Sequence, residues 1–309
     1  MKSSADKTIE RLEGKAKANG ITIAYRIVGP ADGEPVLIIA GVGGQMTEEQ
    51  DPLSEELARR GYRVISFDNR DIGRSTKFEE AGLPDYEAIQ RAMEEGKPAP
   101  IAYTLADMAK DAVDLLNALG IKKAHIVGGS MGGMIAQLIA ASYPDRTLSL
   151  TSIMSTSGNP EIPLGPAASL LTETVGQGAT EEEIFENKVK LYRALEGSAY
   201  PADEAELRER IKKEIKRDHY PEGIARQGAA CIPNGDRREK LQMIKVPTMV
   251  VSGTDDPIVP PAHAKDTAAN IPGAELRLFP GMGHDLPPVL IPMLVDAIEV
   301  VACRARRTS

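Results

Sequence analysis

The 309-residue chain has no tryptophan and only 4 phenylalanines and 8 tyrosines. Aromatic platforms on which bases could stack are therefore scarce. Acidic side chains outnumber basic ones by 45 to 37, and the net charge of −8 repels phosphate backbones, so we expect no nucleic-acid partner. Because the chain has no run of about 18 apolar residues, we also expect no segment that crosses a membrane.

Cysteine is equally scarce. Cys231 and Cys303 are the only two, and their spacing does not decide whether they pair. The first 17 residues are polar and lack the apolar run of a signal peptide. Together these features favour a reducing, cytoplasmic location. The short basic tail over residues 303–309 predicts a frayed, solvated end.

Short β-branched runs alternate with helical patterns along most of the chain. Strands are predicted over residues 21–28, 36–40, 62–67, 124–127, 148–154, 246–251 and 274–279, the first as an edge strand. Between residues 105 and 119 the apolar positions form one helical stripe, with a capping Thr104 before it and Gly120 after it. This alternation predicts an α/β protein with a mainly parallel sheet and helices on both faces.

The alternation stops between residues 157 and 240, where polar helical patterns over 181–196 and 202–218 occur without a convincing strand. We therefore expect an inserted helical subdomain at 157–240, between core segments 1–156 and 241–309. A second interruption, over residues 77–101, predicts a surface loop with one short helix.

The strongest chemical signal is Gly128-Gly129-Ser130-Met131-Gly132, which fits the pattern G-x-S-x-G. The motif directly follows the predicted strand 124–127 and opens a helical segment over 131–143. A serine on such a sharp turn projects its hydroxyl, and the N–H of Met131 lies at the positive end of a helix dipole. The context predicts Ser130 as a nucleophile and the Met131 N–H as an oxyanion donor.

A serine nucleophile needs a base, and the chain offers four histidines. His125 lies inside a predicted strand, His219 lies in a polar stretch expected at the surface, and His263 opens a helix. His284 follows the last predicted strand in the loop Pro280-Gly281-Met282-Gly283. Loops there reach the carboxyl edge of the sheet, where α/β active sites form, so His284 is the predicted base.

The acid that orients this histidine is expected just after strand 246–251, where Asp255 and Asp256 are adjacent. Either carboxylate reaches the same edge of the sheet. Asp256 precedes Pro257, which favours an extended backbone, so we favour Asp256 and leave Asp255 as a turn or solvated residue. The order Ser130, Asp256, His284 matches the Ser…Asp…His order of one class of hydrolases.

A glycine-rich loop, Gly41-Val42-Gly43-Gly44, follows the predicted strand 36–40 and offers the Val42 N–H as the second oxyanion donor. Gly41, Gly43 and Met154 are expected to contact substrate, although Met154 also suits ordinary core filling. A dinucleotide loop would need glycine at position 46, which is methionine. There is no HExxH motif, cysteine pair or histidine cluster, so we expect no bound metal.

With these motifs, the chain resembles the α/β-hydrolase superfamily, and more closely the aclacinomycin methylesterase-like group of serine esterases. The stretch Phe67-Asp68-Asn69-Arg70-Asp71-Ile72-Gly73-Arg74-Ser75 and the loops over 256–260 and 281–284 carry the resemblance, which covers residues 20–155 and 245–300. It implies an eight-stranded, mostly parallel sheet, a helical cap, Ser130, Asp256 and His284 as a triad, and no cofactor. Many relatives have histidine where this chain has Ala40. The charged residues of 68–75 are expected to brace their loop.

The sequence therefore predicts a serine carboxylesterase that hydrolyses small carboxylic esters through an acyl-enzyme, as a monomer or homodimer. The same triad could act as a C–C hydrolase, lactonase, peptidase or perhydrolase, because the fold does not select the bond. A non-catalytic small-molecule receptor is the remaining alternative. Serine at position 130 argues against haloalkane dehalogenases and epoxide hydrolases, whose nucleophile is aspartate.

Overall fold

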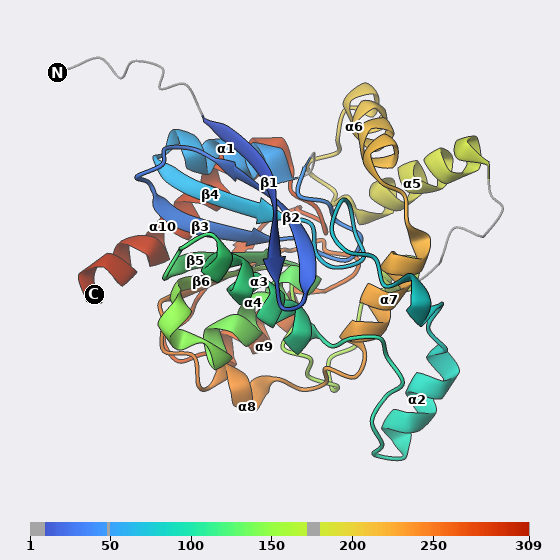
Figure 1. Ribbon diagram of the computed structural model, residues 1–309. Coiled ribbons are helices and arrows are strands. Elements are labelled where there is room, and N and C mark those ends of the chain that lie inside the picture. Colours follow the sequence, from blue (N-terminus) through green and yellow to red (C-terminus); the bar gives the residue numbers. More distant parts are fainter. Residues whose placement is uncertain (1–9, 48–49, 172–179, 309) are drawn as a thin grey trace.

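The computed structural model describes residues 10–47, 50–171 and 180–308. Its centre is an eight-stranded sheet with the strand order β1-β2-β4-β3-β5-β6-β7-β8 (Figure 1). The strands are β1 (Arg11–Ala18), β2 (Ile21–Val28), β3 (Glu34–Ile39), β4 (Tyr62–Phe67), β5 (Ala124–Gly129), β6 (Thr147–Ile153), β7 (Thr248–Gly253) and β8 (Glu275–Phe279). β2 runs antiparallel to β1 and to β4, and the remaining neighbours are parallel. The predicted α/β fold class is confirmed.

The edge of the sheet lies one strand further out than the sequence predicts. β2, expected at the edge, is paired on both sides because Arg11–Ala18 forms β1 beside it. β1 is charged and mostly exposed, as suits an edge strand, and it lacks the apolar run by which the other strands were found. Residues 1–9 of the polar start lie outside the described residues.

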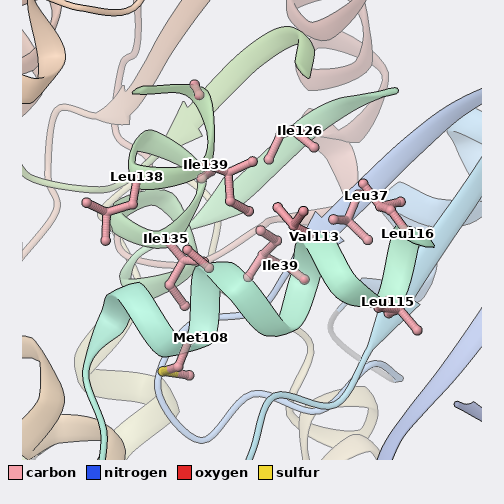
Figure 2. Packing of buried hydrophobic residues seen from close by; sticks show 14 of the residues in the cluster. Leu37, Ile39, Met108, Val113, Leu115, Leu116, Ile126, Ile135, Leu138 and Ile139 are labelled. Carbon is pink, nitrogen blue, oxygen red and sulfur yellow. The ribbon is translucent and has the colours of Figure 1, made fainter. Parts of the chain in front are cut away.

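Helices cover both faces of the sheet because its inner strands alternate their side chains between two apolar clusters. Leu37 and Ile39 of β3 pack under α3 (Leu105–Ala118) and α4 (Met131–Ser142), as Figure 2 shows. Val36 and Ile38 of the same strand face the opposite cluster, which is covered by α1 (Asp51–Arg59) and α10 (Ile291–Thr308).

The helix predicted over 105–119 shows why local signals worked well in the core. Thr104 and Asp107 form a reciprocal capping box: Asp107 N–H donates to the Thr104 hydroxyl at 3.1 Å, and Thr104 N–H donates to the Asp107 carboxylate at 2.8 Å. Of the predicted frayed and solvated tail, only the fraying is wrong. α10 continues to Thr308, and Arg306 within it bonds to Glu34 and Tyr62. Cys303, Arg304, Arg306 and Arg307 are exposed as expected, and residue 309 lies outside the described residues.

Among the described residues between β6 and β7, the longer helices are α5 (Glu181–Leu195), α6 (Glu204–Arg217) and α7 (Pro221–Cys231). Figure 1 places these "inserted helices" beyond the carboxyl ends of the parallel strands. α5 and α6 confirm the two polar helical patterns, whereas α7 was not predicted. Val189, Leu207 and Ile211 give α5 and α6 a small core of their own. Residues 172–179 of this stretch lie outside the described residues.

The remaining elements are short and connect or flank these layers. The α-helices are α2 (Tyr86–Glu94), which is the short helix expected within 77–101, α8 (Arg238–Leu241) and α9 (Pro261–Asn270). The 3-10 helices are η2 (Glu79–Ala81), η3 (Pro144–Arg146), η4 (Ala168–Leu171) and η5 (Pro288–Leu290). Within the described part of the chain, no helix combines the length and apolar character that spanning a membrane requires.

Candidate active site

Ser130 occupies the sharp turn between β5 and α4, where its backbone has φ 53° and ψ −120°. This left-handed conformation is strained for a residue with a Cβ atom. The turn fits only because its neighbours are small: a Cβ on Gly128 would lie 2.1 Å from the Gly132 carbonyl oxygen, and one on Gly132 would lie 2.1 Å from the Ile39 carbonyl oxygen. The Ser130 N–H donates to the Ile153 carbonyl at 2.9 Å, which ties the turn to β6.

The structure brings together the three residues predicted as a triad. The Ser130 Oγ lies 3.0 Å from His284 Nε2, and His284 Nδ1 lies 2.8 Å from Asp256 Oδ2. Both His284 and Asp256 are buried. With the imidazole proton on Nδ1, the ring donates to the carboxylate and its Nε2 lone pair faces the serine hydroxyl. This line of groups can take a proton from the serine as the serine attacks.

The structure places the two adjacent aspartates in different environments. Asp256 Oδ1 accepts hydrogen bonds from the N–H groups of Ile258 at 2.9 Å and Val259 at 2.8 Å, which leaves Oδ2 for His284. Asp255 is exposed and bonds instead to Ser198 and Thr254. The hydrogen bond from Ser198 lowers the pKa of Asp255. Asp256 is therefore the carboxylate placed to orient the imidazole.

The loop that carries His284 is anchored on two sides. The His284 N–H donates to the carbonyl of Leu195, at the end of α5, at 2.8 Å. On the sheet side, the Asp255 N–H donates to the Met282 carbonyl at 3.1 Å, and the Gly281 N–H donates to the Thr254 hydroxyl at 2.8 Å. The inserted helices therefore help to hold the histidine in place.

The other three histidines form no hydrogen bond with Ser130. His125 is fully buried, with Nδ1 2.8 Å from the Ser149 hydroxyl, and burial lowers its pKa. His263 contacts the Thr156 hydroxyl at 2.8 Å, and burial lowers its pKa as well. His219, expected at the surface, is half-buried. Its pKa is lowered by burial and by the positive charge of Lys188.

The glycine-rich loop after β3 lies against the nucleophile. A Cβ on Gly41 would lie 3.2 Å from the Ser130 Cβ and 3.7 Å from its Oγ. Within the described part of the chain, the N–H groups of Val42 and Met131 form no hydrogen bond. Two unpaired donors beside a serine have the chemistry of an oxyanion-binding site.

A cavity of about 150 Å³ adjoins Ser130 and His284. Gly41, Gly43 and Met154, which were expected to contact substrate, all line it. The core contributes further apolar side chains such as Leu53 and Ile153, and the inserted helices contribute Leu191, Leu195 and Ile224. Polar side chains on the wall include Gln50 and Lys188, and Gln50 Oε1 has no partner among the described residues. Such a cavity suits a small, largely apolar ligand.

The charged stretch 68–75 joins the core to the inserted helices. Asp68 pairs with Arg217 of α6 at 2.7 Å, and Asp71 pairs with Arg226 of α7 at 2.8 Å. Arg70 pairs with Asp111 of α3 at 2.6 Å. These buried pairs agree with the bracing role implied by the resemblance. Sequence reasoning missed the partners, because each lies far away in the chain.

Cys231 and Cys303 are both free thiols. Burial raises the pKa of Cys231 to about 12, so its thiol is a poor nucleophile.

In the ranges 10–47, 50–171 and 180–308, no group of three or more histidine, cysteine, aspartate or glutamate side chains is arranged to hold a metal ion.

Residues 34–288 match a protein family described as having the alpha/beta hydrolase fold. The chain is 31% identical over 294 residues to the rhodomycin D methylesterase DauP of Streptomyces sp. (strain C5), covering 87% of this chain and 90% of that protein. It is 30% identical to the putative carbamate hydrolase RutD of Variovorax paradoxus (strain S110), over 84% of this chain and 88% of the relative.

Among solved structures, a hydrolase from Pseudomonas aeruginosa PA01 is similar, with a TM-score of 0.70 and 23% identity. The likeness covers 97% of this chain and 99% of that one, and it shows a shared fold. The family match extends from the start of β3 to the start of η5, just after His284. The resemblance inferred from the motifs is confirmed, and the chain belongs to the α/β-hydrolase family.

Proposed function

We propose that the protein is a serine carboxylesterase that hydrolyses small carboxylic esters through an acyl-enzyme. The observation that carries the proposal is the hydrogen-bonded line from Ser130 through His284 to Asp256, with 3.0 Å and 2.8 Å between the bonded atoms. This line ends at a serine on a strained turn beside a largely apolar cavity. The methylesterase relative supports an ester as the bond that is cleaved.

In the acylation half of the proposed reaction, Ser130 Oγ attacks the ester carbonyl while His284 Nε2 takes its proton. The N–H groups of Val42 and Met131 stabilise the negative oxygen that develops. Asp256 stays ionised and stabilises the imidazolium. His284 then gives its proton to the departing alcohol, which leaves the acyl group on Ser130.

In the second half, a water molecule takes the place of the alcohol. His284 removes a proton from the water as its oxygen attacks the acyl carbonyl, and the proton returns to Ser130 when the carboxylic acid departs. The balance is one ester and one water consumed for one acid and one alcohol released. No further group enters these steps.

The inserted helices serve as the cap in this proposal, with the boundaries 157–240 expected from the sequence. Their side chains Leu191, Leu195 and Ile224 share the cavity with Met154 of the core. An apolar wall of this kind gains free energy from burying the alkyl part of an ester, at about 0.8 kcal/mol for each CH₂ group. We therefore propose small-molecule esters with an apolar acyl or alcohol group as substrates.

The decisive experiment is Ser130→Ala assayed on a p-nitrophenyl ester, together with labelling by a fluorophosphonate. We expect kcat to fall on the order of 10⁶ and covalent labelling to disappear, because nothing else supplies the nucleophile. Circular dichroism and thermal melting would verify that the variant is folded. If Ser130→Ala keeps most of its activity, or if the wild type resists the fluorophosphonate, the proposal fails.

A second candidate keeps the triad and changes the bond. The relative described as a putative carbamate hydrolase favours testing carbamates beside esters. A panel of matched esters, carbamates, lactones, peroxide acceptors, ring-cleavage diketones and aminoacyl anilides would decide between them. The carboxylesterase proposal requires the highest kcat/KM on a carboxylic ester. A protein that resists the fluorophosphonate and turns over no member of the panel would indicate a small-molecule receptor without a reactive serine.

A further inference from the structure

The loop over residues 41–46, here called the oxyanion loop, contains three glycines and has little support of its own. Its internal backbone hydrogen bond runs from the Gly44 N–H to the Gly41 carbonyl at 3.2 Å. Glycine loses more conformational freedom on ordering than any other residue. Other parts of the molecule must therefore hold this loop in one conformation.

Gln227 of α7 supplies the most direct support. Its side chain is completely buried, its Oε1 accepts from the Gly43 N–H at 2.9 Å, and its Nε2 donates to the Arg70 carbonyl at 2.8 Å. One partner is a donor and the other an acceptor, so the orientation of the amide is determined by its surroundings. Gln227 thus fastens the oxyanion loop to the loop of Arg70.

The far end of the oxyanion loop is fastened to α6. Gln45 Nε2 donates to the Glu214 carbonyl at 3.0 Å, and Arg217 donates to Gln45 Oε1 at 2.5 Å. Asp68 accepts from the Met46 N–H at 2.9 Å and from Arg217. The inserted helices therefore contact the loop at two places, Gly43 and Gln45, which both follow Val42 in the chain.

We propose that Gln227 is a positioning residue that sets the oxyanion donor at Val42, so that the inserted helices complete the oxyanion site as well as cover the cavity. The Gly43 N–H belongs to the peptide plane that directly follows the Val42 Cα. Fixing this plane limits rotation about Val42 and so aims the preceding N–H. The inference rests on the proposed acyl-transfer function.

The expected kinetic signature follows from when the donor acts. Negative charge on the substrate oxygen develops in the transition state, so a misplaced donor lowers kcat and leaves KM nearly unchanged. Outright removal of an oxyanion donor costs about 10² to 10³ in kcat. Loss of the support at Gly43 should lower kcat by about 10-fold to 100-fold, because the Val42 N–H remains but is less well aimed.

The test variant is Gln227→Met, which keeps the length of the side chain and removes both hydrogen bonds. Gln137→Met is the matched control: Gln137 is also buried, donates to the Ser152 hydroxyl at 3.1 Å and accepts from Arg237 at 3.3 Å, away from the oxyanion loop. We expect the fall in kcat for Gln227→Met only. Gln45→Met, which releases the other end of the loop, gives a second route to the same effect if Gln227→Met does not fold.

A further measurement distinguishes a misplaced oxyanion donor from a general loss of active-site structure. An alkyl trifluoromethyl ketone forms a charged adduct with the serine, whereas the alcohol product only occupies the cavity. The affinity of Gln227→Met for the ketone should fall in step with kcat/KM, while its affinity for the alcohol stays within about 2-fold of the wild type, because only the adduct carries the negative oxygen.

Three results would overturn the inference: equal kinetic losses in Gln227→Met and Gln137→Met, a fall in kcat without weaker ketone binding, or unchanged kinetics in folded Gln227→Met (in Gln45→Met, if Gln227→Met does not fold). Failure of the proposed function looks different, because it appears in the wild-type protein itself: either a bond other than a carboxylic ester gives the highest kcat/KM, or the protein neither hydrolyses esters nor reacts with a fluorophosphonate. The comparison holds for any acyl substrate that the enzyme turns over.

Discussion

At the residue scale, the site depends on which of two adjacent carboxylates faces the imidazole. Asp256 is buried and uses both oxygens, whereas Asp255 is exposed and bonds to hydroxyl groups. The proline at 257 favoured Asp256 already from the sequence, since it biases the preceding residue to an extended backbone. Substitution of Asp255 is therefore a matched control for the same substitution at Asp256.

Asp256→Asn is expected to lower kcat by about 10⁴, because an amide favours the wrong imidazole tautomer and cannot stabilise the imidazolium. Asp255→Asn should stay within about 2-fold of the wild type. Both would be measured as kcat and kcat/KM on the same p-nitrophenyl ester. Equal losses in the two variants would contradict the assignment of Asp256.

A separate residue-scale prediction concerns His125, which is buried far from the proposed chemistry. Burial lowers its pKa from 6.5; nearby Glu34 opposes the shift, and Arg306 adds to it. In mildly acidic solution the unfolded chain therefore binds a proton that the folded chain does not. The free energy of unfolding falls as the pH drops below about 6.5, by at most about 1.4 kcal/mol per pH unit for this group.

Urea unfolding between pH 5 and pH 8 would measure this slope. His125→Gln should flatten it, because the substituted side chain does not titrate. His219 and His263 also have lowered pKa values and contribute to the remaining slope in the same direction. An identical slope in wild type and His125→Gln would disprove the prediction for His125.

At the element scale, the pattern of successes and failures has a physical basis. β3, β5 and α3 could be predicted because their own sequences carry the pattern. Their apolar residues form a nearly continuous run in the strands and recur every three or four positions in the helix. β1 and α7 were missed because their stability depends on neighbours: β1 is a charged strand paired to β2, and α7 contains small and polar residues held by distant partners. Gln227 was missed for the same reason, since its partners at 43 and 70 lie far away in the sequence.

The docking of α7 gives an element-scale prediction. Arg226 and Asp71 are both almost fully buried and form two hydrogen bonds, at 2.8 Å and 2.9 Å. Arg226→Met leaves the Asp71 charge without its partner and should destabilise the fold by about 3–5 kcal/mol. Denaturant unfolding would measure the loss.

The double variant Asp71→Asn/Arg226→Met is the control for this loss. It removes both charges together, so we expect it to recover a large part of the stability lost in Arg226→Met. A double variant whose loss equals the sum of the two single losses would show that the pair is not coupled.

At the scale of the whole molecule, the cavity is built from two separate stretches of chain. Core residues and inserted helices share its wall, so a ligand that fills it contacts both. The proximity of Ser130, Asp256 and His284 could be predicted because each of them follows a strand that ends at the same sheet edge. The shape of the cavity could not, because it depends on how α5 and α7 rest on the core.

Hydrogen exchange would test this shared wall. A phosphonate with a long alkyl chain, bound to Ser130, should slow exchange in α5 and α7 more than a methyl phosphonate does, because only the long chain reaches Leu191 and Ile224. α2, none of whose residues line the cavity, serves as the internal reference and should not change. Equal protection by both phosphonates would place the alkyl group outside the inserted helices.

The hydrogen bond from the His284 N–H to the Leu195 carbonyl has an evolutionary consequence. The contact is made by main-chain atoms, so it persists whatever side chain occupies position 195. The surface of α5 that lines the cavity can thus diversify through point mutations without displacing the imidazole of His284. Replacing the whole insertion with that of a homologue is a larger change. If the first helix of the new insertion ends at a different position, its last carbonyl no longer lies where the His284 N–H can donate to it.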